Sequence, residues 1–304
     1  MVASVRCGES ARGARDANGY LKYGLRVARL TDDLKKAGLG AHSNDILELA
    51  RVSARIERTR CEQSALARGA SRLGGTADLP AGFAWPVFEE HPLAFIAQLD
   101  LSTLPKTVKE LPQSGTLAFF YADEALKKGF DPKDVGSAHV AYFPAGTQLV
   151  PTPTPEPART YAPCSVTLAR TVDLPSLDDL VCQPLREKLK SSERAAYEKL
   201  VAANDETYHH LLGHPQLIQK DMRVQCELVS QGFNTATPEG YQQGKAFLEG
   251  GINWNLLLQI DSDDDEEEGP GWSWDGVGRL YYWITRSDLE AQRFDRGWLC
   301  LQAY

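Results

Sequence analysis

The sequence predicts an α+β fold that is internally duplicated, with two similar halves built on mainly antiparallel β-sheets and with peripheral helices. Apolar runs of strand length occur in strand–loop–strand pairs and are clearly separated from the helical segments, which favours antiparallel sheets. One arrangement of residues also occurs twice. Gln-Leu-Asp at 98–100 is followed by Gly115 and an aromatic strand, and Gln-Ile-Asp at 259–261 is followed by Gly278 and a second one. The offsets from Gln to Gly are 17 and 19 residues.

Residues 1–45 are predicted to form a basic, partly helical extension. Apolar residues at helical spacing from Leu25 onward indicate a short helix closed by Gly38. Ser43 is a suitable N-cap for a second helix. Residues 1–72 carry 14 Lys/Arg and 8 Asp/Glu, whereas the rest of the chain has a net charge of −14.

Residues 46–148 form the first predicted half. The stretch 71–86 is dense in Gly and Pro and is predicted to be a loop rather than a helix or a strand. A period-two pattern, an almost continuous apolar run and two aromatic runs predict strands. These lie at 52–57, 93–99, 116–122 and 139–143.

Residues 149–160 are predicted to connect the halves, because Pro at four alternate positions makes an extended, stiff chain. A recognition motif for an SH3-type domain is the alternative. Residues 161–304 form the second half, in which 178–203 is the longest helical segment. Its interval from Gly213 to Gln259 is 46 residues, twice the 23 from Gly75 to Gln98, because of a polar insertion.

The polar residues that end the repeated strands are the first candidates for a site. One interpretation is that Gln98, Asp100, Gln259 and Asp261 grip a ligand or a peptide backbone in a cleft shared by the two halves. The other is that the amides satisfy loop backbone groups that burial would leave unpaired. Trp85 is expected to pack as a lid over the strand that follows it and is also a candidate ligand- or partner-binding residue.

The paired aromatics at 119–121 and 281–283 have two interpretations, a stacking platform for bases or sugars and a packed core, and we favour the core. His210 and His214 are four apart, but Gly213 and Pro215 interrupt any helix between them, so we predict no metal site. His214 remains a candidate ligand-binding residue. No cofactor motif is present, and we predict none.

Residues 261–268 contain seven acids in eight positions. The run lacks the Gly and Glu positions of an EF-hand loop. It is either a solvated loop or a negatively charged surface that attracts a partner with a basic surface. The partner-facing residues would then be Asp263, Asp264, Asp265, Glu266, Glu267 and Glu268.

The acidic body disfavours nucleic-acid binding, and no run of residues is long and apolar enough to predict a membrane helix. The N-terminus lacks the apolar centre of a signal peptide. The six cysteines form no CxxC pair and are expected to be mostly buried, reduced residues. We therefore expect a cytoplasmic protein.

Several motifs resemble those of the YwqG-like family, the bacterial domain of unknown function 1963, in the family's order over about residues 50–304. They are GGTADLPAGFAWP, PLAFIAQLDL, GTLAFFYAD, LLGHPQLIQKDM, LLLQIDSD and GRLYYWITRSDL. The family has no established activity. Its members occur beside polymorphic toxin systems, so the resemblance implies a partner-binding role, in some members of the immunity type.

No nucleophile elbow or other catalytic constellation is recognisable. The sequence therefore favours a non-catalytic protein that binds a protein partner through its acidic surface or the cleft between its halves. The alternative is an enzyme or small-ligand receptor with its site in that cleft.

Overall fold

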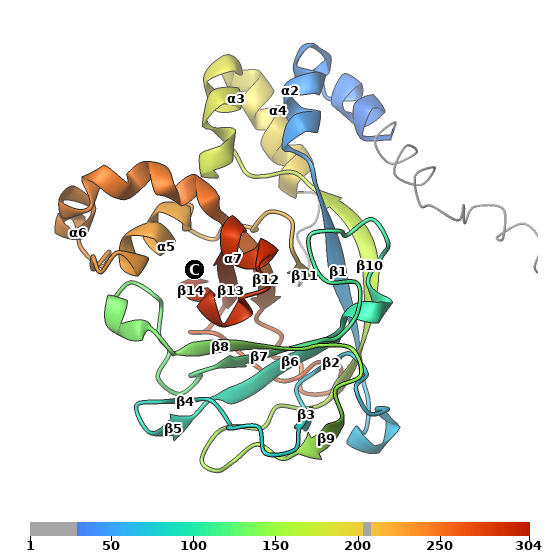
Figure 1. The fold of residues 1–304 in the computed structure, drawn as a ribbon. Helices are drawn as coiled ribbons and strands as arrows, with labels where there is room; N and C mark the ends of the chain where they lie inside the picture. The colour runs from blue at the N-terminus through green and yellow to red at the C-terminus, as the bar shows by residue number, and fades with distance from the viewer. Residues whose placement is uncertain (1–28, 203–207) are drawn as a thin grey trace, which may run out of the picture.

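A single ten-stranded antiparallel sheet organises the computed structural model, which describes residues 29–202 and 208–304 (Figure 1). Its strand order is β14-β13-β12-β11-β1-β10-β2-β6-β7-β8. Helices lie around the sheet, so the predicted α+β class with mainly antiparallel strands is confirmed. Most of residues 1–45 lie outside the described residues, but residues 29–36 are helical and Gly38, at φ +78°, follows them.

The large sheet contains β1 (Arg51–Arg60), β2 (Arg72–Leu73), β6 (Ala94–Asp100), β7 (Thr116–Tyr121), β8 (Ala138–Phe143), β10 (Cys164–Asp173), β11 (His209–Leu211), β12 (Trp254–Asp261), β13 (Gly278–Thr285) and β14 (Trp298–Ala303). Two small sheets pair β3 (Ala77–Pro80) with β9 (Leu149–Thr152) and β4 (Val87–Phe88) with β5 (His91–Pro92).

The α-helices are α2 (Ser43–Leu49), α3 (Gln183–Lys188), α4 (Ser191–Val201), α5 (Arg223–Ser230), α6 (Pro238–Gln243) and α7 (Arg286–Glu290). Short 3₁₀ helices are η2 (Gly40–His42), η3 (Gln63–Ala65), η4 (Leu101–Thr103), η5 (Pro132–Asp134), η6 (Leu180–Cys182), η8 (Lys245–Asn253) and η9 (Phe294–Arg296). The helical segment predicted at 178–203 is therefore broken, with Leu189 extended at ψ 136° between α3 and α4.

The loop predicted at 71–86 was wrong in detail, whereas the extended chain predicted at 149–160 agrees with a strand there. The stretch 71–86 contains β2 and β3, and the connector 149–160 contains β9, which pairs with β3. Pro151 lies opposite Asp78 in a two-stranded sheet, where a missing N–H is tolerated because both strands are edges. Strands this short leave no periodic pattern in a sequence.

The first strands of the two halves lie side by side at the centre of the sheet. β1 pairs with β10 along its whole length, from Arg51 opposite Asp173 to Arg60 opposite Cys164. On its other side β1 pairs with β11, while β10 pairs with β2. Each half therefore supplies a strand to the other half's part of the sheet.

The sheet is nearly closed, and its inner face holds the main core. Phe119 on β7 and Tyr282 on β13 meet across it with ring centroids 5.3 Å apart, and the Tyr282 hydroxyl donates to the carbonyl of Phe120. Near the two edge strands, Leu301 donates its backbone N–H to Lys128 O, and Trp298 Nε1 donates to Gly129 O. The aromatics at 119–121 and 281–283 are all buried, which confirms their predicted role in the core.

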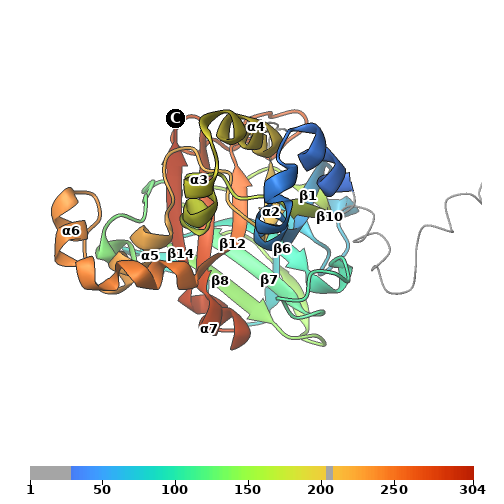
Figure 2. The same ribbon diagram turned by 90° about the horizontal axis from the view of Figure 1, so that it is seen from above.

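The outer face is covered differently in the two halves. Over the first half, β3, β9 and the loop around Trp85 cover Phe95, Phe120 and Phe143. Over the second half, α5 covers Trp254, Tyr281 and Trp283. Helices α2, α3 and α4 pack together beside the start of β1, as Figure 2 shows from above. None of the helices in the described residues has the length and apolar content needed to cross a bilayer.

Candidate functional site

Gln98 is fully buried, and its amide holds a loop of the first half in place. Its Oε1 accepts a hydrogen bond from Asp78 N at 2.8 Å, and its Nε2 donates to Ala70 O at 3.1 Å. The loop between these contacts contains Gly74 and Gly75, both with positive φ, and Gly74 N donates to Ile96 O.

Gln259 makes the same contacts in the second half. Its Oε1 accepts from Gln216 N and its Nε2 donates to Tyr208 O, both at 2.9 Å. Leu212 and Gly213 have positive φ, as Gly74 and Gly75 do. In the first half, Ala70 accepts from the glutamine amide and lies five residues before Gly75, while Asp78 donates to it and lies three residues after Gly75. In the second half, Tyr208 and Gln216 lie at the same distances from Gly213.

Both amides are therefore occupied by backbone groups, as in the second interpretation drawn from the sequence. β6 and β12 are separated by four strands, so the structure does not bring Gln98 and Gln259 together. Asp100 accepts from Ser102 N and caps η4. Asp261 pairs with Arg279, with Oδ1 2.9 Å from Nε.

Trp85 packs in the position expected of a lid. Its indole lies edge-on to Phe120, with ring centroids 5.2 Å apart, and its Nε1 donates to Leu93 O at 2.9 Å. It therefore covers β6 and β7 as part of a packed outer layer.

The acidic run divides into buried and exposed carboxylates. Asp263 is only 5% exposed and receives two hydrogen bonds from Arg58, at 2.6 and 2.8 Å. Burial raises the pKa of Asp263, but hydrogen bonds from His209 and Arg58 outweigh burial and lower it to about 2. Asp263 is therefore a structural residue, contrary to its expected place on a partner-facing loop. Asp264, Asp265, Glu266, Glu267 and Glu268 are exposed.

Within residues 29–202 and 208–304, no group of three or more His, Cys, Asp and Glu side chains is arranged to hold a metal ion. The histidines make hydrogen bonds instead. His209 Nδ1 accepts from Asp261 N, and His210 Nδ1 lies 2.7 Å from Leu212 O.

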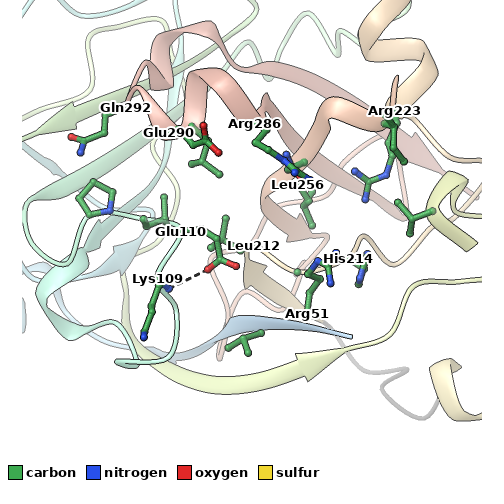
Figure 3. A pocket seen from close by; sticks show the side chains of 18 residues that line it. Arg51, Lys109, Glu110, Leu212, His214, Arg223, Leu256, Arg286, Glu290 and Gln292 are labelled. Atoms are coloured by element: carbon green, nitrogen blue, oxygen red, sulfur yellow. Dashed lines mark hydrogen bonds between the residues drawn. The ribbon is translucent and has the colours of Figure 1, made fainter. Parts of the chain in front are cut away.

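A cleft of about 870 Å³ opens where the two halves meet (Figure 3). Its lining includes residues of both halves: 51–52 at the start of β1, 109–112 before β7, 212–214 after β11, 252–256 leading into β12, and 286–292 on and after α7. His214 lies in this wall, whereas the repeated Gln and Asp residues do not line it.

The charged wall of the cleft rests on a buried ion network. Arg223 Nε donates to Asp179 at 3.1 Å, its NH1 donates to Trp254 O, and its guanidinium lies 5.1 Å from the centre of the Trp283 ring. Burial, followed by the charge of Asp179, raises the pKa of Asp221 to about 7. Burial opposes ionisation of Asp179, but Arg223 and then His214 outweigh it and lower its pKa. The charge of Arg223 is thus already balanced.

His214 is neutral and keeps one unused ring nitrogen. Its Nε2 lies 2.7 Å from Leu49 O, a group that only accepts, so Nε2 carries the ring proton. Burial lowers the pKa of His214 to about 4. Nδ1 has no hydrogen-bond partner among the described residues. It is a buried acceptor in the wall of the cleft.

Sequence reasoning found His214 and missed the other charged residues of the cleft, including Arg51, Glu110, Arg286 and Glu290. They come from three separate segments, and nothing in the local sequence distinguishes them from other charged residues. A signal was present only in Gly213, whose positive φ and close approach to Asp173 fix the turn that carries His214.

The comparison with curated proteins returns no significant match. The model of the family described as Domain of unknown function (DUF1963) matches residues 71–303, which is most of the chain and spans both halves of the sheet. This chain therefore belongs to the DUF1963 (YwqG-like) family.

Proposed function

We propose that this protein is a non-catalytic binding protein and that its ligand, or a segment of its protein partner, occupies the cleft between the two halves. The observation that carries the proposal is the cleft itself. Its volume of about 870 Å³ falls within the range of ligand pockets, and both halves contribute to its lining. Sites at the junction of two structural units are common because each unit supplies one wall.

The chemistry of the lining supports binding over catalysis. Among the described lining residues there is no Ser, Thr, Cys or Tyr that could act as a nucleophile. His214 is neutral and hydrogen-bonded to a carbonyl, and Arg223 is held by Asp179. These groups shape a fixed wall, and Arg51, Arg286, Glu110 and Glu290 supply charge at its rim.

We further infer that the two halves arose by duplication of one unit. The strand order supports this. From the central pair β1 and β10, the strands on one side are β11, β12, β13 and β14 in order, and those on the other side are β2, β6, β7 and β8. Each strand therefore has a counterpart at the same distance from the centre. The matched hydrogen bonds of Gln98 and Gln259 also support it. The units would be 46–148 and 161–304, with 149–160 between them, each exchanging its first strand with the other.

A second candidate function is the capture of a basic protein partner by the exposed acidic loop, as an immunity-type protein would do. The five exposed carboxylates at 264–268 support it, because a dense negative surface speeds association with a basic partner. Four described cysteines are buried free thiols, which supports a cytoplasmic protein.

Two variants test the cleft against the acidic loop. Ile252 lines the cleft and is 47% exposed, so Ile252→Trp should narrow the cleft without disturbing the core. Val135 is 68% exposed and does not line the cleft, so Val135→Trp is the matched control. In the third variant Glu266, Glu267 and Glu268 are all replaced by Lys.

Each variant would be used in a pull-down coupled to mass spectrometry and in thermal shift assays with a metabolite and peptide panel. Cleft binding predicts that Ile252→Trp loses the ligand or partner and that Val135→Trp keeps it. Loss caused by the lysine variant alone, with binding that weakens as salt rises, would support the acidic loop instead. Retention of binding by Ile252→Trp would refute the cleft proposal.

A further inference from the structure

The charges of the cleft are separated between its two ends. Figure 3 shows Arg51 with His214 and Arg223 at one end, while Glu110 and Gln292 lie at the other. On α7, Arg286 lies toward the basic end and Glu290 toward the acidic end, as Figure 3 shows. The Lys109 side chain is directed away from the middle of the cleft (Figure 3). The cleft is therefore dipolar rather than uniformly basic.

The rim charges are not neutralised by each other. Among residues 29–202 and 208–304, Arg286 has no carboxylate within ion-pair distance, and Arg51 uses only NH1, on the carbonyls of Glu48 and Ala50. Arg286 and Glu290 are four apart on α7, but Arg precedes Glu, which is the less favourable order for a pair on a helix. Glu110 accepts a hydrogen bond from the backbone N–H of Lys109 at 3.1 Å, which holds its carboxylate in place. Arg286 and Glu290 thus remain available to a ligand.

The middle of the cleft is aliphatic. Leu212, Leu256 and Leu289 line it, with Ile252 at its edge. No aromatic side chain is among the described lining residues, so a planar base would find no ring to stack on. The Nδ1 atom of His214 is buried and lies 3.8 Å from Asp179 Oδ2, so a ligand in the cleft does not reach it.

We infer, on the basis of the proposed function, that the cleft binds an aliphatic zwitterionic peptide. Its carboxylate lies at the end formed by Arg51 and Arg286, and its ammonium lies at the end formed by Glu110 and Glu290. The aliphatic body covers Leu212. The two charges come either from the termini of a free peptide or from acidic and basic side chains within a segment of a larger protein.

Titration calorimetry with defined peptides tests the inference. One series is a tetrapeptide of leucine and alanine with free termini, its N-acetylated form, its C-amidated form and its doubly blocked form. A second peptide has both termini blocked and carries lysine and aspartate side chains on either side of leucines. Loss of either charge should weaken binding about tenfold or more, since each charged hydrogen bond contributes about 1.5–3 kcal/mol.

Matched variants connect each charge to its protein group. Arg286→Gln should weaken binding of the free peptide about tenfold and leave binding of the C-amidated form unchanged. Glu290→Gln should also weaken binding of the free peptide about tenfold, but should leave binding of the N-acetylated form unchanged. Arg296 is exposed and does not line the cleft, so Arg296→Gln should change neither affinity. Unchanged melting temperatures would show that the variants are folded.

The result identifies the source of the charges. Binding of the free-terminus peptide supports a free peptide ligand, and binding of the internal lysine–aspartate peptide supports a segment of a partner protein. Equal binding of the doubly blocked tetrapeptide, or no binding of any of these peptides, would overturn the inference. If Ile252→Trp still abolishes binding of another ligand or partner, only the peptide inference has failed. If Ile252→Trp changes nothing, the proposed function has failed.

Discussion

The buried glutamines allow a quantitative test of the matched halves, because replacing each by Leu removes two hydrogen bonds to backbone. In Gln98→Leu, the N–H of Asp78 loses its acceptor. Ala70 O keeps a second donor, since Arg72 Nε also reaches it at 3.2 Å. One buried group is left unsatisfied, at a cost of about 1–3 kcal/mol. We expect Gln98→Leu to lower the free energy of unfolding by about 2 kcal/mol.

Gln259→Leu should cost more. The N–H of Gln216 and the carbonyl of Tyr208 both lose the amide, and within residues 29–202 and 208–304 no other donor to Tyr208 O replaces it. Two unsatisfied groups predict a loss of about 4 kcal/mol. Gln98 and Gln259 share no partner, so the double variant should lose the sum of the two single effects.

Urea denaturation followed by circular dichroism would measure these free energies, provided that unfolding is two-state. The exposed Gln242→Leu is the control and should stay within about 0.5 kcal/mol of the native protein. Losses below about 0.5 kcal/mol in Gln98→Leu and Gln259→Leu would contradict the structural role assigned to the amides. A larger loss in Gln98→Leu would contradict the difference between the two sites.

Two further predictions concern buried charge. The folded protein holds the proton of Asp221 more tightly than the unfolded chain, because burial and the charge of Asp179 raise its pKa from 3.8 to about 7. This stabilisation is complete below the unfolded pKa and is lost as pH rises through about 7, by at most about 4 kcal/mol. Asp221→Asn should remove this fall in the free energy of unfolding with rising pH, as measured by denaturation between about pH 4 and 8. An unchanged pH dependence in the variant would contradict the role assigned to Asp221. Arg58→Met leaves the Asp263 carboxylate without its main partner and should cost about 2 kcal/mol or more at pH 7 in urea denaturation. Glu266 is exposed, so Glu266→Gln should leave the free energy of unfolding nearly unchanged. An equal loss in Arg58→Met and Glu266→Gln would refute the division of the acidic run into buried and exposed carboxylates.

The strands that could be predicted from the sequence are those whose pattern is local. Continuous apolar runs and the Gly residues that open or close them located β6, β7, β12 and β13. The amide at the end of β6 was recognisable because it interrupts such a run. Its hydrogen bonds were not, because Ala70 and Asp78 lie 28 and 20 residues away in the chain.

The remainder depends on contacts that leave no local trace. The seven acids of the run look alike in sequence, but Asp263 is buried where Arg58, 205 residues away, reaches it. The pairing of β1 with β10 brings first strands of the two halves together, which no single segment indicates. The cleft is assembled from several segments for the same reason.

The proposed duplication also explains why a second hollow exists and why it differs from the cleft. A pocket of about 560 Å³ is lined by Asp123, which follows β7, and by Asp275, in the loop before β13. The cleft is lined by Arg286, which follows β13, and by Pro112, in the loop before β7. The two hollows therefore occupy corresponding places in the two units.

Under the proposed duplication, the chemistry of the two hollows differs at corresponding positions. Asp123 lies eight residues after Gly115, and Arg286 lies eight residues after Gly278. An acid thus stands in one hollow where a base stands in the other, and Tyr161 donates a hydrogen bond to that acid. The second hollow does contain a base, Arg159, but it lies in the segment between the two units and not at the position that corresponds to Arg286. A duplicated scaffold of this kind can keep one architecture in both units while an exchanged charge gives the two hollows different ligand preferences.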